Sequence, residues 1–306
     1  MTVATAAELP AEPAARDTTQ RAHVLRRLFR DKVAFCAAIV LTLVGLSAIF
    51  APVVAPHDPY LTDLSKVMQP PDLFDADKWS AKGPRHWFGT DNTGRDILSR
   101  VIYGARNTLL MGLCGVLIGG MLGGLLGILA AYYRKADGYI MRVVDIMLAF
   151  PALLIGLALA AIFGAGLTAV LIALVVSDIP GVARVARGSA MGVMGQEYME
   201  AGRAVGVSDF TLIWRYLTLN CISTIFVYLT LRFGQTILIG SALGFLGMGA
   251  QPPVAELGMM AAQGRDFLFM APHIATIPSL AIFVIVLAAN LLGDALRDVL
   301  DPRLQT

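Results

Sequence analysis

Six long apolar stretches, separated by shorter polar segments, dominate the pattern of this chain. They cover residues 33–55, 108–133, 139–163, 167–183, 221–246 and 274–292. A helix rises about 1.5 Å per residue, so about 20 apolar residues are enough to cross a hydrocarbon core of about 30 Å. The pattern therefore predicts an all-α membrane protein with six transmembrane helices.

Composition agrees with this prediction. The chain has 306 residues, of which 57% are hydrophobic and 15% charged, and its mean hydropathy is +0.68. Soluble domains carry about 25% charged residues. The cysteines lie in or beside apolar segments and the four histidines are scattered along the chain, so neither a disulfide framework nor a metal site is expected. The cysteines are Cys36, Cys114 and Cys221.

The polar segments suggest how the chain is organised. Residues 1–32 form a disordered, basic tail, and 33–55 is a first membrane anchor rather than a cleaved signal peptide. Residues 56–107 form an extracytoplasmic loop with an interfacial segment, 108–295 the transmembrane core, and 296–306 a cytoplasmic tail. Most of the 24 basic residues fall on the side of the N-terminus, which places both termini and the segment 184–220 in the cytoplasm.

Three further expectations concern the spans. Seven glycines in 108–133 should permit close helix packing. The stretch 167–183 should be interrupted at Asp178 and Pro180, and 247–272 should be a loop with a re-entrant helical piece. The glycines are residues 112, 115, 119, 120, 123, 124 and 127.

The segment 184–220 is polar and basic, and its centre predicts two short helices. Glu200 is followed by small residues, and Gly206 can end the first helix by taking a positive φ. Ser208 and Asp209 offer N-cap oxygens for a second helix over 210–217. Such a pair with a small-residue face can dock another protein, although a helix lying flat at the membrane interface is the commoner arrangement.

This segment resembles the EAA-type coupling loop of ATP-binding-cassette importer permeases. Four more blocks resemble the dipeptide/oligopeptide/nickel permeases, in particular the second of their two permease subunits, and they follow one another in the order found in that family. They are GTDNTGRDILSRVIYGAR (89–106), RVVDIMLAFP (142–151), ALGFLGMGAQPP (242–253) and GDALRDVLDPRL (293–304). The chain departs from the family pattern at Gly202, where the motif has a second alanine, and at Thr218-Leu219, where Leu-Pro is usual.

The resemblance implies a permease subunit in a bacterial inner membrane. Its partners would be a homologous permease, two ATP-binding subunits and an extracytoplasmic substrate-binding protein. ATP and Mg would be bound by the partners, and this chain, which has no phosphate-binding loop, would hold no cofactor and catalyse nothing. Docking would fall to Glu197, Glu200, Ala201, Gly202, Arg203, Ala204, Gly206, Ser208 and Asp209.

The substrates implied first are di- and oligopeptides, with nickel, glutathione and haem as alternatives in the same family. An ion-driven secondary transporter is a rival of another class, but it predicts inverted repeats that the sequence does not clearly show. A channel or a purely structural membrane subunit would leave the docking segment unexplained.

Ionisable residues within spans are candidates for the translocation path, because lipid exposure of a charge costs a few kcal/mol. Arg142 and Asp145 form either a local i,i+3 pair or part of a gate, and Asp178 could pair with Arg232. Further candidates for the path or a gate are Met248 and Gln251. The block at 89–106 is either a family-specific structural element or an interfacial helix, capped by Asp91 or Thr93, whose arginines meet headgroups. Its charged residues are Asp91, Arg95, Asp96, Arg100 and Arg106.

Overall fold

The computed structural model describes residues 31–72 and 85–300, and all its regular elements within these ranges are helical. The expectations for residues 1–30, with their basic cluster Arg26, Arg27 and Arg30, and for 301–306 lie outside the described residues. In chain order the elements are α2 (Lys32–Ile49), α3 (Ala51–Val54), η1 (Leu64–Lys66), α4 (Ile97–Tyr132), α5 (Arg134–Ala149), α6 (Ala152–Phe163), α7 (Leu167–Met194), α8 (Glu197–Ala204), α9 (Asp209–Thr211), η4 (Leu212–Thr218), α10 (Leu219–Phe245), α11 (Leu257–Gly264), η5 (Arg265–Phe267) and α12 (His273–Leu300).

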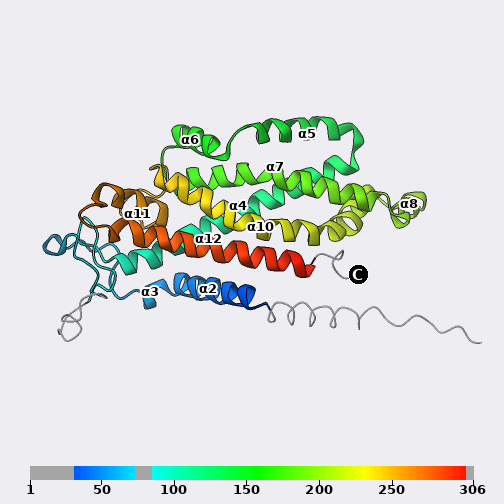
Figure 1. The fold of residues 1–306 in the computed structure, drawn as a ribbon. Helices are drawn as coiled ribbons and strands as arrows, with labels where there is room; N and C mark the ends of the chain where they lie inside the picture. The colour runs from blue at the N-terminus through cyan, green and yellow to red at the C-terminus, as the bar shows by residue number, and fades with distance from the viewer. Residues whose placement is uncertain (1–30, 73–84, 301–306) are drawn as a thin grey trace, which may run out of the picture.

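The long helices form a bundle with distinct ends (Figure 1). Helix α7 packs against α4 and α10, α12 against α10 and α11, and α2 against α12 and α4. Helix α8 stands at one end of the bundle, and α11 with the loops that precede α4 lies at the other. The first turn of α2 and the last turns of α12 are directed toward the end that carries α8.

Five helices are long and apolar enough to cross a membrane, and a sixth span exists if α5 and α6 count as one. These two helices are bent by 90° at the residues between them. Pro151 lies at the bend, lacks an amide hydrogen and disfavours helical geometry at Phe150. The third span expected over 139–163 is therefore not one straight helix, and it counts as a span only as this bent pair.

Two other boundaries differ from expectation. Helix α7 runs through Asp178 and Pro180 for 28 residues instead of breaking there. A single proline removes one hydrogen bond of the helix, and Asp178 is satisfied by side chains of α10, so neither residue ends it. Helix α4 begins at Ile97 and continues to Tyr132, so the block at 89–106 contains no separate interfacial helix.

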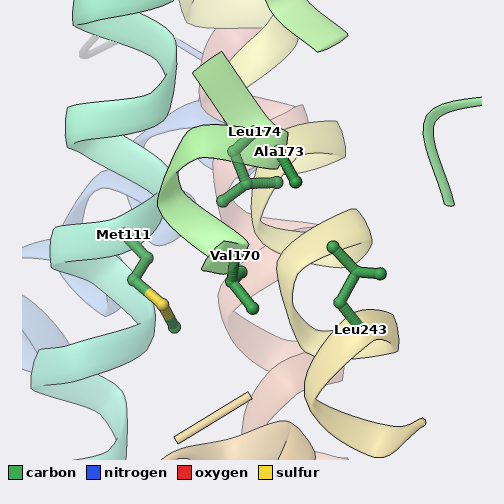
Figure 2. Close-up of a cluster of buried hydrophobic side chains, with 5 residues drawn as sticks. All are labelled: Met111, Val170, Ala173, Leu174 and Leu243. Atoms are coloured by element: carbon green, nitrogen blue, oxygen red, sulfur yellow. The ribbon is translucent and has the colours of Figure 1, made fainter. Parts of the chain in front are cut away.

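The glycines of α4 let it approach two neighbours. A Cβ at Gly119 would lie 2.8 Å from the carbonyl oxygen of Val175 on α7, and one at Gly120 would lie 2.7 Å from Leu229 on α10. Next to this contact, a buried apolar cluster joins α4, α7 and α10 (Figure 2). The cluster consists of Met111, Val170, Ala173, Leu174 and Leu243. The predicted close packing is confirmed, with some glycines facing α7 and others facing α10.

The end of the chain largely follows the predicted pattern. The stretch 247–272 contains the expected helical piece, α11, which packs against α10 and α12. Glu256 caps it by accepting hydrogen bonds from the amides of Gly258 and Met259. Burial raises the pKa of the Glu256 carboxyl to about 7, against the opposing effect of those two amides.

Candidate functional site

Helix α8 is an eight-residue element that connects α7 to the helices leading into α10. Met199 is its buried anchor, with 1% of its surface exposed. Gly202 faces Leu212, where an added Cβ would lie 3.0 Å from the leucine side chain. The departure from the family motif at this position therefore permits closer packing of the two helices.

The remaining candidates on α8 are exposed. They are Glu197, Glu200, Ala201, Arg203 and Ala204. Because the two carboxylates and the small residues are presented to the outside, the helix offers a charged face that another backbone can approach closely.

The turn after α8 has the predicted geometry. Gly206 has a φ of +81°, and its amide donates to the carbonyl of Arg203 at 3.1 Å. The next amide, of Val207, donates to the carbonyl of Gly202 at 3.0 Å, which completes a Schellman motif. Ser208 then caps the next helix by accepting from the amide of Thr211. This helix does not stop at residue 217, because α9 and the π-helical η4 run directly into α10.

Tyr132, which the sequence did not single out, ties this loop to the bundle. Its hydroxyl donates to Asp209 at 2.6 Å, so Asp209 accepts a tertiary hydrogen bond while Ser208 provides the cap. The guanidinium of Arg203 lies over the Tyr132 ring at 5.3 Å from its centroid. The loop is thus held by the last turn of α4.

Large apolar side chains are exposed beside these charges. Val205, Phe210 and Trp214 are 84%, 76% and 63% exposed. A groove of about 850 Å³ opens beside α8, lined by the ends of α4 and α7, the start of α5, and by Glu200 and Arg203 of α8. Exposed apolar side chains grouped beside charged ones are typical of a protein-contact surface.

Ion pairs tie α5 to α7 near the same end. Arg187 donates to both carboxylate oxygens of Asp137 at 2.6 Å each, and Arg184 donates to Asp145 at 2.7 Å. Arg142 is exposed, and the i,i+3 pair with Asp145 is replaced by this contact between helices. The complementary charges on α5 and α7 were visible in the sequence, but their pairing depends on the packing of the two helices.

The pair between Asp178 and Arg232 is present inside the bundle. Arg232 donates from Nη2 and Nε to one oxygen of Asp178 at 2.6 and 3.0 Å, and Thr236 donates to the other oxygen at 2.8 Å. The Asp178 side chain is 1% exposed and that of Arg232 is 21% exposed. Arg232 also donates to Gln235 at 2.7 Å, so it connects the buried carboxylate to a more open environment.

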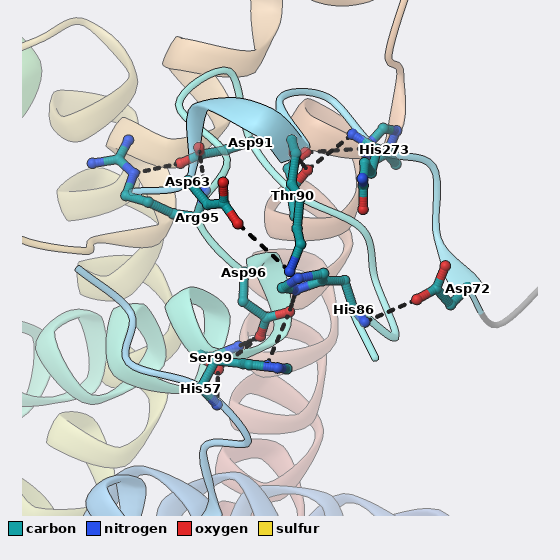
Figure 3. A network of polar contacts seen from close by, with 12 residues as sticks. His57, Asp63, Asp72, His86, Thr90, Asp91, Arg95, Asp96, Ser99 and His273 are labelled. Carbon is teal, nitrogen blue, oxygen red and sulfur yellow. Dashed lines mark hydrogen bonds and ion pairs between the residues drawn. The ribbon is translucent and has the colours of Figure 1, made fainter. Parts of the chain in front are cut away.

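The charged block around the start of α4 is mostly buried, at the end opposite α8 (Figures 1 and 3). Asp91 accepts from Arg95 Nε at 2.7 Å and lies 3.5 Å from Arg100 Nε. Arg100 is 2% exposed and donates to the carbonyl of Pro59 at 3.2 Å. The alternative of an interfacial helix is wrong, because Arg95 and Arg100 lie inside the protein and the N-cap of α4 is Asp96. The third arginine of the block, Arg106, is exposed.

Met248 and Gln251 lie between α10 and α11. The carbonyl of Met248 accepts from the amide of Gly166, which joins this turn to the start of α7. Gln251 is exposed and donates to the carbonyls of Gly247 and Gly249. Their position is compatible with a gate, but their contacts are those of a structured turn.

Comparison with known proteins identifies the family. The family described as binding-protein-dependent transport system inner membrane component matches residues 123–306, and the N-terminal TM domain of oligopeptide transport permease C matches residues 19–71. This chain belongs to that family of ABC importer permeases. It is a non-catalytic, multi-pass inner-membrane permease of a transporter complex whose partner ATPase subunits handle ATP. The rival interpretation as an ion-driven transporter is thereby set aside.

Two relatives of this chain are permeases named for glutathione transport. The chain is 40% identical over 96% of its length to the glutathione transport system permease protein GsiD of Pectobacterium atrosepticum, covering 96% of that protein. It is 42% identical over 92% of its length to GsiD of Escherichia coli O6:K15:H31, covering 89% of it.

Solved structures share the fold of this permease. A chain of the inward-facing MetNI methionine ABC transporter aligns with 65% of the permease. The alignment covers 96% of that transporter chain, with 19% identity and a TM-score of 0.54. A chain of an amino acid ABC transporter crystallised with histidines aligns with 64% of the permease. The alignment covers 92% of that transporter chain, with 18% identity and a TM-score of 0.50. At such identities the likeness concerns the fold alone.

Proposed function

We propose that this permease forms half of the translocation pore of an importer for glutathione or a closely related short peptide. The observation that carries the proposal is its 40–42% identity, over nearly the whole chain, to permeases named for glutathione transport. Glutathione was an alternative in the sequence analysis, and it now has more support than di- and oligopeptides in general. The other pore half would be a homologous permease, served by two ATP-binding subunits and an extracytoplasmic substrate-binding protein.

The proposed topology places α8 and both chain ends in the cytoplasm. Arg134, Lys135, Arg184 and Arg187 lie in helices near the end that carries α8, whereas the loops at the other end contain long polar segments. Basic residues close to membrane spans favour the cytoplasmic side. This orientation brings the exposed face of α8 within reach of the ATPase subunits.

Coupling would rest on three properties of the α8 surface. Glu197 and Glu200 can accept charge-assisted hydrogen bonds from a basic groove of the partner. The small residues Ala201 and Ala204 allow close backbone approach, and the apolar side chains exposed beyond Gly206 provide buried anchors once docked. ATP-driven closure of the partners would then move α8 as a unit.

The path for substrate would run along α10. Arg232 and Gln235 form the polar part of the wall, with Arg232 held in place by Asp178. A fixed guanidinium suits a substrate with carboxylates, such as glutathione. We place Met248 and Gln251 at one gate, and Arg142 with Asp145 near the opposite one.

Uptake measurements test the substrate. Cells without their own glutathione and peptide importers would express the complete system and receive radiolabelled glutathione, with dipeptides and pentapeptides as unlabelled competitors. We expect uptake that glutathione competes away and the pentapeptides do not. Equal competition by pentapeptides, or no uptake of glutathione, would contradict the assignment.

Co-purification tests the docking element. We expect the native permease to retain its ATPase subunits and a Glu200→Arg/Gly206→Leu variant to lose them while still inserting in the membrane. Gly195→Ala is the matched control, because this glycine has φ −84° and its Cβ would meet nothing closer than 3.8 Å. Unchanged ATPase retention and unchanged transport-linked hydrolysis in the double variant would reject α8 as the docking element.

A further inference from the structure

Three segments of the chain bring potential metal ligands together at the end opposite α8 (Figure 3). His57 follows α3, His86 lies in the loop before α4, and Asp96 is the N-cap of α4. One oxygen of Asp96 lies 2.9 Å from Nδ1 of His86 and 3.6 Å from Nδ1 of His57. One ligand atom from each residue lies within 4.8 Å of the other two.

His86 and Asp96 are buried, His57 is partly exposed, and the cluster is incompletely hydrogen-bonded. Asp96 and His86 are 2% and 7% exposed. Among the described residues, three buried side-chain atoms have no hydrogen-bond partner, and two of them are His57 Nδ1 and His86 Nε2. Nδ1 of His86 is hydrogen-bonded to Asp96 at 2.9 Å, so the unsatisfied nitrogen beside the carboxylate is His57 Nδ1. Buried imidazole nitrogens are normally satisfied, and this one indicates a missing ligand.

The carboxylate is fixed in the orientation that a metal site requires. The second oxygen of Asp96 accepts from the amide and the hydroxyl of Ser99, at 2.8 and 2.7 Å. The hydroxyl oxygen of Ser99 in turn accepts from the backbone amide of His57 at 3.0 Å. Ser99 thus holds both Asp96 and the His57 segment, as outer-shell partners hold the ligands of known metal sites.

We propose that His57, His86 and Asp96 bind a divalent first-row transition metal of the Zn²⁺ type. Two imidazoles and one carboxylate form a usual ligand set for Zn²⁺, whereas Mg²⁺ and Ca²⁺ prefer oxygen ligands alone. Zn²⁺ holds nitrogen and carboxylate ligands at about 2.0–2.2 Å, which in a tetrahedral site leaves the ligand atoms about 3.3–3.6 Å apart. Nδ1 of His86 and the Asp96 oxygen, now 2.9 Å apart, would therefore separate slightly, whereas the 3.6 Å between Asp96 and Nδ1 of His57 already fits. A water molecule would take the fourth position.

The surroundings provide access and suggest what the metal does. An open cavity of about 490 Å³ is lined by His57, Pro59, Tyr60 and Tyr103, and it gives the ion a route from solvent. The ion would clip two separate loop segments to the first turn of α4. This role is independent of the substrate, so it goes beyond the proposed function.

Metal analysis of the complete importer tests the proposal. The complex, purified without a histidine tag and stripped with a chelator, would be titrated with Zn²⁺ and with Co²⁺, whose visible absorption reports tetrahedral coordination. We expect one tightly bound ion per copy of this permease. His57→Gln and His86→Gln should each weaken binding at least tenfold and abolish the Co²⁺ bands. His273→Gln is the matched control, since this histidine lies at the same end but contacts the carbonyl of Thr90 instead.

Two results would overturn the proposal. One is the absence of stoichiometric metal in the native complex, and the other is unchanged binding in the two histidine variants. Should these variants fold poorly, the native complex decides the matter. Zn²⁺ should raise its thermal unfolding temperature and the chelator should reverse the shift, whereas an unchanged temperature counts against the site.

Discussion

The buried pair between Asp178 and Arg232 gives the sharpest quantitative expectation. Removing one partner of a buried ion pair typically costs about 3–5 kcal/mol, because the other charge stays buried without compensation. In Arg232→Met, the Asp178 carboxylate is 1% exposed and keeps only the Thr236 hydroxyl as a side-chain donor. We therefore expect the full loss of about 3–5 kcal/mol from the free energy of unfolding.

The converse substitution should be milder. In Asp178→Asn, the guanidinium of Arg232 keeps its contact with Gln235 and its 21% exposure. Asparagine has the size of aspartate, and this matters because residue 178 packs tightly against Gly119 of α4. A Cβ added at Gly119 would lie only 2.9 Å from the Cβ of Asp178. We expect a loss of about 1.5–3 kcal/mol, the usual range for a hydrogen bond to a charged group. The same close packing leaves no room for arginine at position 178, so exchanging the two charges is not a useful rescue.

The double variant completes the cycle. Asp178→Asn/Arg232→Met should be more stable than the sum of the single losses predicts, by about 2 kcal/mol, since neither charge is left behind. Tryptophan fluorescence during reversible unfolding in mixed micelles measures each free energy. Arg106→Met is the control, because this arginine is exposed and its loss should change stability by less than about 0.5 kcal/mol. Additive effects of the two substitutions would refute the pair as an energetic unit.

Three more expectations follow from other positions. Gly123→Ala should destabilise the protein, because the added Cβ would lie 2.5 Å from the carbonyl oxygen of Ile179. Gly138→Ala meets no neighbouring atom and should stabilise α5 by up to about 1 kcal/mol. Thermal unfolding should therefore show a lower midpoint for the first variant and a higher one for the second. Glu256 has a pKa of about 7 against a usual 4.5, so its contribution to the free energy of unfolding is fully present below pH 4.5 and is lost as the pH rises through 7. The loss is about 3 kcal/mol at most, and Glu256→Gln should remove this dependence in unfolding measured from pH 4 to 9. Gly206→Val should cost about 1–2 kcal/mol through its positive φ alone and reduce ATPase retention, and unchanged stability would show that the turn relaxes.

Local chemistry explains why part of the candidate site could be predicted. The turn at Gly206 and the cap at Ser208 depend on residues within one helical turn of each other, so the sequence contains the whole signal. The existence of the apolar helices likewise follows from runs of apolar residues, but their ends do not, since α4 begins at Ile97 and α7 continues to Met194. The roles of the exposed α8 residues remain predictions.

Tertiary packing explains what the sequence did not reveal. Asp145 has a possible partner three residues away in Arg142, yet it pairs with Arg184 on α7 because the two helices lie side by side. Pro180 looked like a break and Pro151 did not, although of the two only Pro151 interrupts the helical run. The two prolines differ in their surroundings, since Pro180 is buried in a packed bundle and Pro151 is exposed.

The position of α8 between α7 and α10 links docking to the buried pair. Asp178 lies on α7, which continues without a break to Met194, a distance of about 24 Å along the helix axis. Arg232 lies on α10, which begins after the π-helical η4, a wide helical form often found at functional sites. A displacement of α8 would be transmitted along the uninterrupted α7 and absorbed partly by η4, so it should shift the two partners relative to each other. Distances between spin labels on α7 and α10 should therefore change when the ATPase subunits bind ATP, and an unchanged distribution in a transport-competent complex would mean that coupling takes another route.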